Sequence, residues 1–429
     1  MKVLMFGWEF PPHISGGLGT ACYGLTKAIL KQGVEIIFVV PRAFGDEDAG
    51  KIRLVNASEV PVDFTDEIFR EHIAKISYLE VDSILVPYAS EEEFYFLTEQ
   101  IDKGVKPEQI TSRIQKFSFS GGYGKYLMEE VKRYAFVGTE IARKFDFDVI
   151  HAHDWLTYMA GIEAKRISRK PLVVHMHATE FDRSGENVNQ QVYDIERAGM
   201  EAADRVISVS NLTRNIVIAR YGINPEKVVT VHNAVEPLHP ASMFDTSKNV
   251  DEKIVTFLGR ITFQKGPEYF IEAANKVLKR DPNVRFVMAG SGDMMHNMVR
   301  RVARLGISTR FHFTGFLRGE DVDRMFGMSD VYVMPSVSEP FGISPLEAMM
   351  SNVPVIISKQ SGVAEILNYV IKVDFWDIDA MADAIYGLLH YNSLPEMFRK
   401  HGKAEVESIK WDHAGKKVIE IYQSLLPSG

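Results

Sequence analysis

The sequence has almost no cysteine and no long apolar segment. Cys22 is the single cysteine among 429 residues, which excludes an internal disulfide and fits a reducing compartment. The apolar run at the N-terminus ends at Glu9 and is too short for a secretory signal, and nowhere do about eighteen apolar residues follow one another. We therefore expect a soluble, cytoplasmic protein that does not insert into a membrane.

Positive charge is also scarce. The 49 lysines and arginines are outnumbered by 57 aspartates and glutamates, which gives a formal net charge of −8. A protein without a broad basic face is not expected to bind nucleic acid. The apolar share of 46% and the charged share of 25% are ordinary for a globular protein. Because 429 residues are too many for one hydrophobic core, two domains are expected.

Short apolar strands alternate with amphipathic helices along most of the chain. A strand, a glycine-rich loop, a helix and a second strand follow one another within residues 2–41, and the alternation is regular again from residue 254. This spacing predicts an α/β fold with doubly wound parallel sheets. Residues 237–251 are polar, contain proline and lack periodicity, which predicts an interdomain linker.

The most informative stretch covers residues 330–348. Its pattern predicts a buried strand, a loop broken by proline and glycine, and the start of a helix. Glu339 falls in the loop and Glu347 in the first helical turns, near the crevice at the carboxyl ends of parallel strands where such sheets bind ligands. Backbone N–H groups at the helix N-terminus favour a phosphate, and they belong to Gly342, Ile343 and Ser344. An anion between two carboxylates indicates a sugar nucleotide.

Positive side chains follow an earlier strand of the same half. A predicted strand ends at Gly259 and is followed by Arg260, and Lys265 comes just before the next helix. Glutamates alone are more often solvated surface residues. Arginine, however, supplies a planar fork and lysine a point charge, and both suit a diphosphate. The two motifs together therefore favour a nucleotide-sugar site over an ordinary surface.

A glycine-rich loop follows the first strand. Gly16 and Gly17 carry no Cβ, so the backbone there allows a ligand to approach closely. A dinucleotide-binding fingerprint would need a shorter loop and a third glycine or an alanine where Cys22 stands. We therefore expect backbone donation to a ligand at this loop and do not expect NAD.

Histidines and an aspartate stand at the ends of two further strands. His151, His153 and Asp154 close one strand, and His175 and His177 close the next. Imidazole and carboxylate groups can bind zinc, but no further histidine follows Asp154 closely and strand residues alternate between faces. We therefore expect no metal. We also expect only one histidine of the second strand to face the ligand, namely His177, with His175 in the core.

The two motifs of the second half resemble those of retaining glycosyltransferases of the GT-B fold. They are G-R-x4-K-G at residues 259–266 and E-x7-E at residues 339–347. The resemblance covers nearly the whole chain and is to glycosyltransferase family four and the related glycogen and starch synthases. It implies two Rossmann-like domains that face each other across a cleft. It also implies that the C-terminal helix returns to the first domain, which gives domain limits of 1–236 plus 410–429 and of 252–409.

The resemblance assigns roles to the candidate residues. It implies that Glu347 holds the ribose hydroxyls, that Glu339 contacts the sugar hydroxyls and that His177 steadies the transferred sugar. It implies that Asp154, in H-A-H-D-W, contacts the acceptor or donor, and that the glycine loop faces the donor phosphates, although bacterial relatives usually carry lysine where this chain has Ser15. The expected catalytic residues are His177, Arg260, Lys265, Glu339 and Asp154. The expected nucleotide and phosphate ligands are Gly16, Gly17, Arg260, Lys265, Gly342, Ile343, Ser344 and Glu347.

The resemblance also implies a reaction. It implies a retaining glucosyltransferase that moves glucose from UDP- or ADP-glucose to the non-reducing end of an α-1,4-glucan. Because Arg260 and Lys265 can neutralise the leaving diphosphate, no metal or other cofactor is expected. The alternatives are a family-four enzyme acting on a small sugar or a lipid-linked acceptor, a GT-B-shaped epimerase, and a silent glucan-binding protein. An insertion at about 44–124 either shapes the acceptor site or is a surface excursion without a role.

Overall fold

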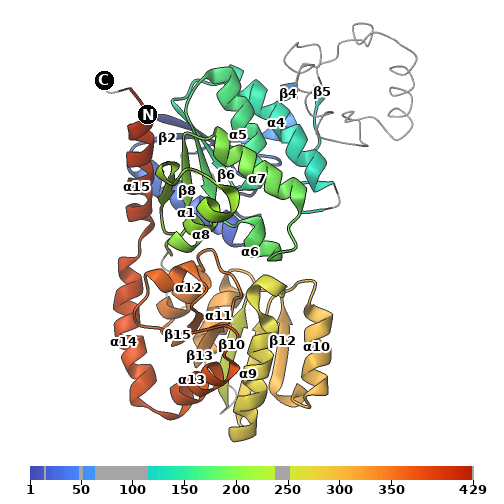
Figure 1. Ribbon diagram of the computed structural model, residues 1–429, viewed down its shortest axis with the longest axis vertical. Helices are drawn as coiled ribbons and strands as arrows, with labels where there is room; N and C mark the ends of the chain where they lie inside the picture. Colours follow the sequence, from blue (N-terminus) through green and yellow to red (C-terminus); the bar gives the residue numbers. More distant parts are fainter. Residues whose placement is uncertain (14–15, 48–51, 63–114, 125, 237–251, 428–429) are drawn as a thin grey trace, which may run out of the picture. The chain divides into compact units, whose positions relative to one another are not determined.

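The computed structural model (Figure 1) describes residues 1–13, 16–47, 52–62, 115–124, 126–236 and 252–427. The chain forms two compact units, one of Met1–His175, Ile195–Val206 and Glu420–Gly429, the other of Met176–Asp194 and Ile207–Ile419. Ser15, the linker predicted at 237–251 and most of the predicted insertion lie outside the described residues. The domain limits expected from the sequence stay a prediction.

A seven-stranded sheet contains the first strands of the chain, in the order β3-β2-β1-β6-β7-β8-β9. β1 pairs in parallel with both β2 and β6, so the winding of the chain reverses there. Such a reversal opens a ligand crevice at the carboxyl ends of the two strands. The strands are β1 Lys2–Phe6, β2 Glu35–Val40, β3 Arg53–Asn56, β6 Val149–His153, β7 Leu172–Met176, β8 Arg205–Ser208 and β9 Val228–Thr230.

Helices connect these strands, and two of them pack together at a glycine. A Cβ on Gly138 in α4 would lie 2.7 Å from the carbonyl oxygen of Ala160 in α5, so only glycine allows this approach. The helices are α1 Gly17–Lys31, α4 Leu127–Lys144, α5 Trp155–Ser168, α6 Glu180–Ser184, α7 Gln190–Ala202 and α8 Asn211–Tyr221. Two short strands, β4 Pro61–Val62 and β5 Gln115–Lys116, pair antiparallel.

A six-stranded sheet lies at the centre of the second unit, in the order β12-β11-β10-β13-β14-β15. All five neighbouring pairs are parallel. β10 lies between β11 and β13, so this sheet also has a point at which the winding reverses. The strands are β10 Lys253–Leu258, β11 Val284–Ala289, β12 Phe311–Gly315, β13 Val331–Met334, β14 Val355–Ser358 and β15 Ile371–Val373.

Apolar clusters cover both faces of the second sheet. Along β13, Val331 and Val333 belong to one cluster, and Tyr332 and Met334 belong to the other. Because neighbouring strand residues point to opposite faces, the clusters lie on opposite sides of the sheet, as a doubly wound fold requires. The helices of this half are α9 Pro267–Arg280, α10 Met295–Arg304, α11 Glu320–Met328, α12 Ser344–Met350, α13 Ile378–His390, α14 Ser393–Ser408 and α15 Trp411–Leu425.

The predicted fold class of doubly wound parallel sheets is confirmed. Cys22 is buried, and burial raises the pKa of its thiol, so the thiol stays protonated near neutral pH. In the part of the chain that the structure describes, none of the helices has the length and apolar character needed to cross a membrane.

Candidate functional site

The two predicted motifs meet at the carboxyl ends of β10 and β13. These strands are parallel neighbours, so the loops that follow them lie at one edge of the sheet. Lys265, in the single turn η5 Phe263–Lys265, forms a salt bridge with Glu339 in the loop after β13. Arg260 follows β10 directly after Gly259. The structure therefore brings Arg260, Lys265 and Glu339 to the point where the winding of the sheet reverses, which is where such sheets bind ligands.

Glycine is required where the loops of this edge touch. Gly266 has a φ of +61°, and a Cβ there would lie 2.2 Å from the carbonyl oxygen of Pro335. Gly290, directly after β11, has a φ of +139°, and its Cβ would lie 1.8 Å from the carbonyl oxygen of Gly259. Both distances exclude any side chain. These contacts hold the loop after β10 against the ends of its two neighbouring strands.

The ion pair of Lys265 and Glu339 is held by further polar contacts. The Ser336 hydroxyl donates to Glu339 Oε2 at 3.1 Å. A separate hydrogen bond orients the neighbouring arginine, because Arg260 Nη2 donates to Gln264 Oε1 at 3.3 Å. The side chains of Glu339 and Lys265 are 8% and 21% exposed, so water screens their charges only weakly. Arg260 itself is exposed. The edge therefore offers one oriented ammonium and one accessible guanidinium to an anion.

The loop before α12 presents backbone donors. Among the described residues, the N–H groups of Gly342 and Ile343 donate to no protein acceptor. The Tyr332 hydroxyl donates to the Leu258 carbonyl at 3.3 Å and lies 2.8 Å from the Ser344 hydroxyl oxygen. The Ser344 side chain is therefore engaged with Tyr332, and its predicted phosphate contact rests on its backbone N–H group alone.

Glu347 lies in the first turn of α12 and is partly exposed. Burial of the carboxyl, and to a smaller extent the negative charge of Asp323, raises its pKa to about 7. The ionised form is therefore disfavoured in the free protein. Hydroxyl donors of a ligand would favour that form, because a hydrogen bond to a carboxylate lowers its pKa. A carboxyl perturbed in this way, in a predicted binding site, fits a ligand contact.

We expect Glu347→Gln to stabilise the free protein above neutral pH. The folded-state pKa of about 7 lies above the ordinary value of 4.5, so the ionised carboxylate costs stability. This cost is absent below about pH 4.5, grows as the pH rises toward 7 and is complete above it, where it reaches about 3 kcal/mol at most. Thermal unfolding should show a larger gain in Tm at about pH 8 than at about pH 5. Equal changes at both pH values would contradict the raised pKa of Glu347.

His177 follows β7, and its imidazole is neutral at physiological pH. Burial, and then the positive charge of Arg183, lowers its pKa to about 3. A neutral imidazole donates one hydrogen bond and accepts one, which suits steadying a sugar more than proton transfer. β7 ends at Met176, so His177 is separated from the core residue His175 by the end of the strand. The contact of His177 with a sugar stays a prediction.

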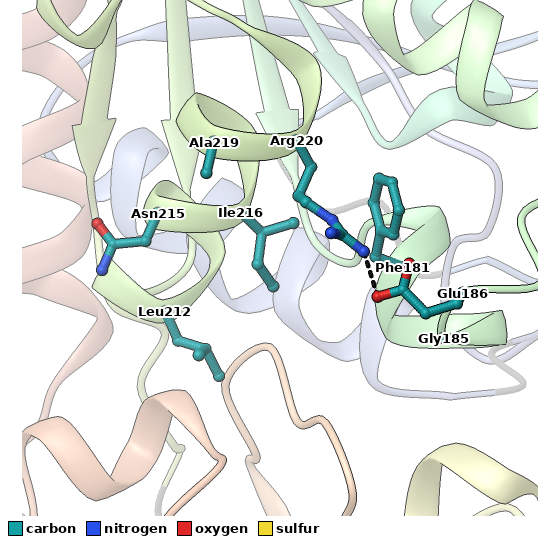
Figure 2. A pocket seen from close by; sticks show the side chains of 8 residues that line it. All are labelled: Phe181, Gly185, Glu186, Leu212, Asn215, Ile216, Ala219 and Arg220. Carbon is teal, nitrogen blue, oxygen red and sulfur yellow. Dashed lines mark hydrogen bonds and ion pairs between the residues drawn. The ribbon is translucent and has the colours of Figure 1, made fainter.

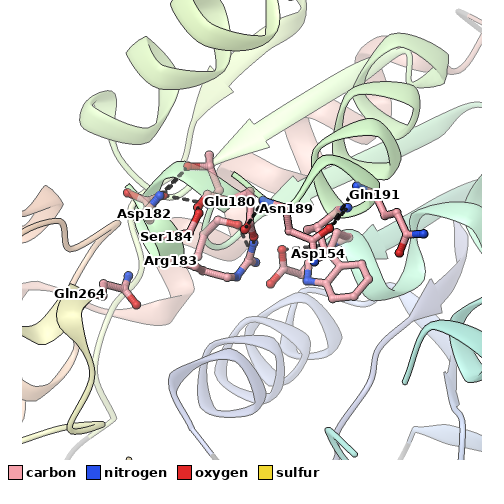
Figure 3. A network of polar contacts seen from close by, with 12 residues as sticks. Asp154, Glu180, Asp182, Arg183, Ser184, Asn189, Gln191 and Gln264 are labelled. Atoms are coloured by element: carbon pink, nitrogen blue, oxygen red, sulfur yellow. Dashed lines mark hydrogen bonds and ion pairs between the residues drawn. The ribbon is translucent and has the colours of Figure 1, made fainter. Parts of the chain in front are cut away.

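The segment after His177 is a short helix held by polar contacts (Figure 3). Thr179 and Asp182 form a capping box, in which Asp182 Oδ2 accepts from the Thr179 N–H group at 2.7 Å. Asp182 is 1% exposed, and its other carboxylate oxygen accepts from the Ser338 hydroxyl. Ser338 directly precedes Glu339. Sequence reasoning missed both Asp182 and Ser338, although T-x-x-D resembles a capping-box signature.

Asp154, Gly16 and Gly17 belong to the first compact unit. Gly16 caps α1, and a Cβ at Gly16 or Gly17 would meet no atom within 4 Å, so the backbone there is open. Asp154 follows β6 with a φ of 64°, and its Oδ1 accepts from the Trp155 N–H group at 3.0 Å. Positive φ at a residue other than glycine is strained and concentrates at functional sites. The roles expected for these three residues stay predictions.

His151, His153 and His175 form a buried stack. Ring centroids lie 4.2 Å apart for His151 and His153 and 5.4 Å apart for His151 and His175, with 4° between the latter rings. The expectation that strand alternation separates these histidines is wrong, because residues two positions apart share a face. One ligand atom from each lies within 4.8 Å of the others. His151 Nδ1 also lies 2.5 Å from the Tyr422 hydroxyl. The expectation that no metal binds stays a prediction.

A pocket of about 370 Å³ is lined by residues of α6 and α8 (Figure 2). Phe181, Leu212 and Ile216 give it apolar walls. Arg220 forms a salt bridge with Glu186 and lies 4.4 Å from the centroid of the Phe181 ring. None of the predicted site residues lines this pocket. The candidate donor site is therefore defined by the side chains at the ends of β10 and β13.

Two protein-family models match the chain. The model described as Glycosyltransferase Family 4 matches residues 104–237, and the model described as Glycosyl transferases group 1 matches residues 239–405. The second match contains Arg260, Lys265, Glu339 and Glu347. The predicted donor motifs therefore lie within a glycosyltransferase domain.

Sequence similarity to known proteins extends over most of the chain. An uncharacterized glycosyltransferase of Methanocaldococcus jannaschii is 28% identical, over 99% of this chain and 98% of its own length. An α-maltose-1-phosphate synthase of Mycolicibacterium smegmatis is 29% identical, over 65% of this chain and 79% of its own length. A glycogen synthase of Mycobacterium tuberculosis is 22% identical, over 85% of this chain and 80% of its own length.

Solved structures share the fold. Sucrose-phosphate synthase from Thermosynechococcus elongatus gives a TM-score of 0.70 at 17% identity, covering 99% of this chain and 98% of its own. HepE of Anabaena, in complex with UDP and glucose, gives a TM-score of 0.66 at 18% identity, covering 99% of this chain and 100% of its own. The two family matches identify the chain as a glycosyltransferase of family-four type, and these likenesses, with the two parallel sheets, show that it has the GT-B fold.

Proposed function

We propose that this enzyme is a retaining glucosyltransferase that moves glucose from UDP- or ADP-glucose to the non-reducing end of an α-1,4-glucan. The observation that carries the proposal is the salt bridge of Lys265 and Glu339 beside the exposed Arg260, at the reversal point of the second sheet. Two relatives are named as an α-maltose-1-phosphate synthase and a glycogen synthase, and HepE was solved with UDP and glucose. These names support a nucleotide-linked glucose as the donor.

The donor diphosphate would bind where the positive groups gather. Arg260 and Lys265 supply cationic donors, and the backbone N–H groups of Gly342, Ile343 and Ser344 supply neutral ones. Glu347, in the helix that begins at Ser344, would accept hydrogen bonds from the ribose hydroxyls. A bound diphosphate would share the Lys265 ammonium with Glu339. The remaining acceptor capacity of Glu339 would then serve the glucose hydroxyls.

The chemistry follows from the charge of the leaving group. As the bond between glucose C1 and the diphosphate oxygen breaks, negative charge builds on the diphosphate, and preorganised cations stabilise it. The acceptor hydroxyl attacks C1 from the same face and gives its proton to the departing phosphate oxygen, which retains the α-configuration. Glu339 is committed to Lys265, so it is poorly placed to act as a covalent nucleophile. His177, neutral and close to its strand end, would hold a sugar hydroxyl.

Nucleotide release measured by HPLC tests this proposal. UDP-glucose and ADP-glucose are each incubated with glycogen, with glucose, with sucrose, with a lipid-linked sugar and without an acceptor, and the linkage of any product is determined by NMR. We expect glycogen to stimulate release from one donor and the product to carry new α-1,4 linkages. If glycogen stimulates release from neither donor, the acceptor assignment is wrong. Conversion of the nucleotide sugar without any acceptor would indicate an epimerase.

We expect metal chelation to leave glucose transfer unchanged. Arg260 and Lys265 supply the positive charge that a metal ion provides in other transferases, and their charge does not depend on a bound ion. Initial rates with about 5 mM EDTA should lie within about twofold of the untreated rate. An EDTA-inhibited enzyme that Mg²⁺ or Mn²⁺ restores would contradict this prediction.

A further inference from the structure

A hydrogen bond joins the segment that carries His177 to the loop that carries Glu339. Its donor is the Ser338 hydroxyl and its acceptor is Asp182 Oδ1. Asp182 lies in α6, which follows His177 closely, and Ser338 is the residue before Glu339. Both partners belong to the second compact unit. This contact therefore connects the segments that carry His177 and Glu339, and the proposed reaction needs these two side chains at a fixed distance from each other.

Asp182 is a fixed anchor. Its Oδ2 accepts from the N–H group and from the hydroxyl of Thr179, both at 2.7 Å, and the residue is 1% exposed. Burial raises the pKa of its carboxyl, and the hydrogen bonds from Ser338 and Thr179 oppose this rise. Arg183 Nη2 also donates to the Ala178 carbonyl at 2.7 Å, which connects α6 to the residue after His177. A buried carboxylate with three donors has little freedom to turn.

The loop before Glu339 is held from two sides. On one side, the Val337 N–H group donates to the Gln264 carbonyl at 2.9 Å, and Gln264 directly precedes Lys265. On the other side, Ser338 donates to Asp182. The backbone of Glu339 is also fixed, because its N–H group donates to the Gln360 carbonyl at 3.0 Å and its carbonyl accepts from the Gly362 N–H group at 2.9 Å. Loss of the second contact therefore frees the Ser338 side of the loop and not the whole loop. The orientation of Glu339, and of the Lys265 ammonium that it binds, would then be set less narrowly.

We propose that Asp182 is a positioning residue, which acts through Ser338 to hold Glu339 and Lys265 in register with His177 during transfer. The proposal rests on the proposed glucosyl transfer. Asp182 touches neither the donor nor the reacting atoms in this scheme. Misplacement of groups at a reacting centre lowers the rate of the chemical step more than it weakens nucleotide binding. Loss of the contact is therefore expected to lower kcat and to leave the affinity for UDP unchanged.

Ser338→Ala tests the proposal with a small change. A hydrogen bond to a charged group has an effect of roughly tenfold to hundredfold, so kcat for glucose transfer should fall by that factor. The KM for the donor and the Kd for UDP, measured by calorimetry, should stay within about twofold of wild type. Ser338→Thr keeps the hydroxyl and should recover most of the rate. Adding Asp182→Asn to Ser338→Ala should lower kcat little further, because the asparagine oxygen can still accept from Thr179 while its amide nitrogen replaces the oxygen that faced Ser338.

Ser329→Ala is the matched control. The Ser329 hydroxyl bonds to the Met325 carbonyl within the same unit at 2.7 Å, and this variant should keep the wild-type rate. A wild-type kcat in Ser338→Ala would overturn the positioning role while the proposed function stands. The positioning role would also be overturned if Ser338→Thr fails to recover the lost kcat and the Ser338 variants have a lower Tm than wild type. If the wild-type enzyme releases nucleotide from neither donor, the proposed function fails, and the positioning role fails with it.

Discussion

Lys265→Ala is expected to lower kcat for glucose transfer by a factor of about 100 to 1,000. The change removes a cation from the place where, in the proposed reaction, leaving-group charge develops. It also leaves the Glu339 carboxylate, which is 8% exposed, without its counter-charge beside an anionic substrate. Initial rates of nucleotide release at saturating donor measure the effect. Because the interaction strengthens as the diphosphate departs, kcat should fall more than KM rises.

Lys276→Ala is the control for this variant. Lys276 also pairs with a carboxylate of the second unit, Asp379, but the two side chains are 42% and 78% exposed, so the pair has little effect. This variant should keep the wild-type rate. Lys265→Arg keeps the positive charge but changes the shape of the side chain, so its kcat should lie between those of Lys265→Ala and Lys276→Ala. A Lys265→Ala enzyme within about threefold of wild type would show that Lys265 does not stabilise the transition state.

Gly290→Ala is expected to lower the free energy of unfolding by about 3 kcal/mol or more and to abolish UDP binding. A Cβ at this position would lie 1.8 Å from the carbonyl oxygen of Gly259, and the φ of +139° is unfavourable for alanine. Gly259 precedes Arg260, so relief of the overlap would displace the residue that we propose binds the diphosphate. Denaturant unfolding measures the first effect and calorimetry the second.

Gly306→Ala separates the effect of steric overlap from the effect of a positive φ on stability. Gly306 also has a positive φ, +70°, but no atom lies within 4 Å of its Cβ position. Its substitution should cost about 1 kcal/mol through the backbone alone and leave UDP binding unchanged. If both glycine variants lose equal stability, the close approach of Gly290 to Gly259 does not occur in solution.

The donor motifs could be predicted from the sequence because their placement is set by local patterns and one topological rule. Apolar runs define β10 and β13, and the reversal of winding makes them neighbours. Residues that follow them must then meet at one edge of the sheet. Arg260, Lys265 and Glu339 meet there, and Glu347 begins the adjoining helix. Neither the hydroxyl contact of Ser344 nor the burial of Glu347 has a comparable local signal.

Contacts between distant segments had no signal in the sequence. Asp182 and Ser338 are 156 positions apart, and no periodicity indicates that one accepts a hydrogen bond from the other. Thr179 and Asp182 do show a local pattern, T-x-x-D, but that pattern indicates only the cap of a helix and not a partner elsewhere in the chain. The stack of His151 with His175 depends on the register of β6 with β7. Register is set by packing of the whole sheet, which a single sequence does not display.

A crystal structure with UDP or ADP bound tests the central claim most directly. The account predicts diphosphate oxygens within hydrogen-bonding distance, about 3 Å, of Arg260 and Lys265, with the ribose hydroxyls at Glu347. A nucleotide bound away from the carboxyl ends of β10 and β13, with both cationic side chains directed elsewhere, would contradict it.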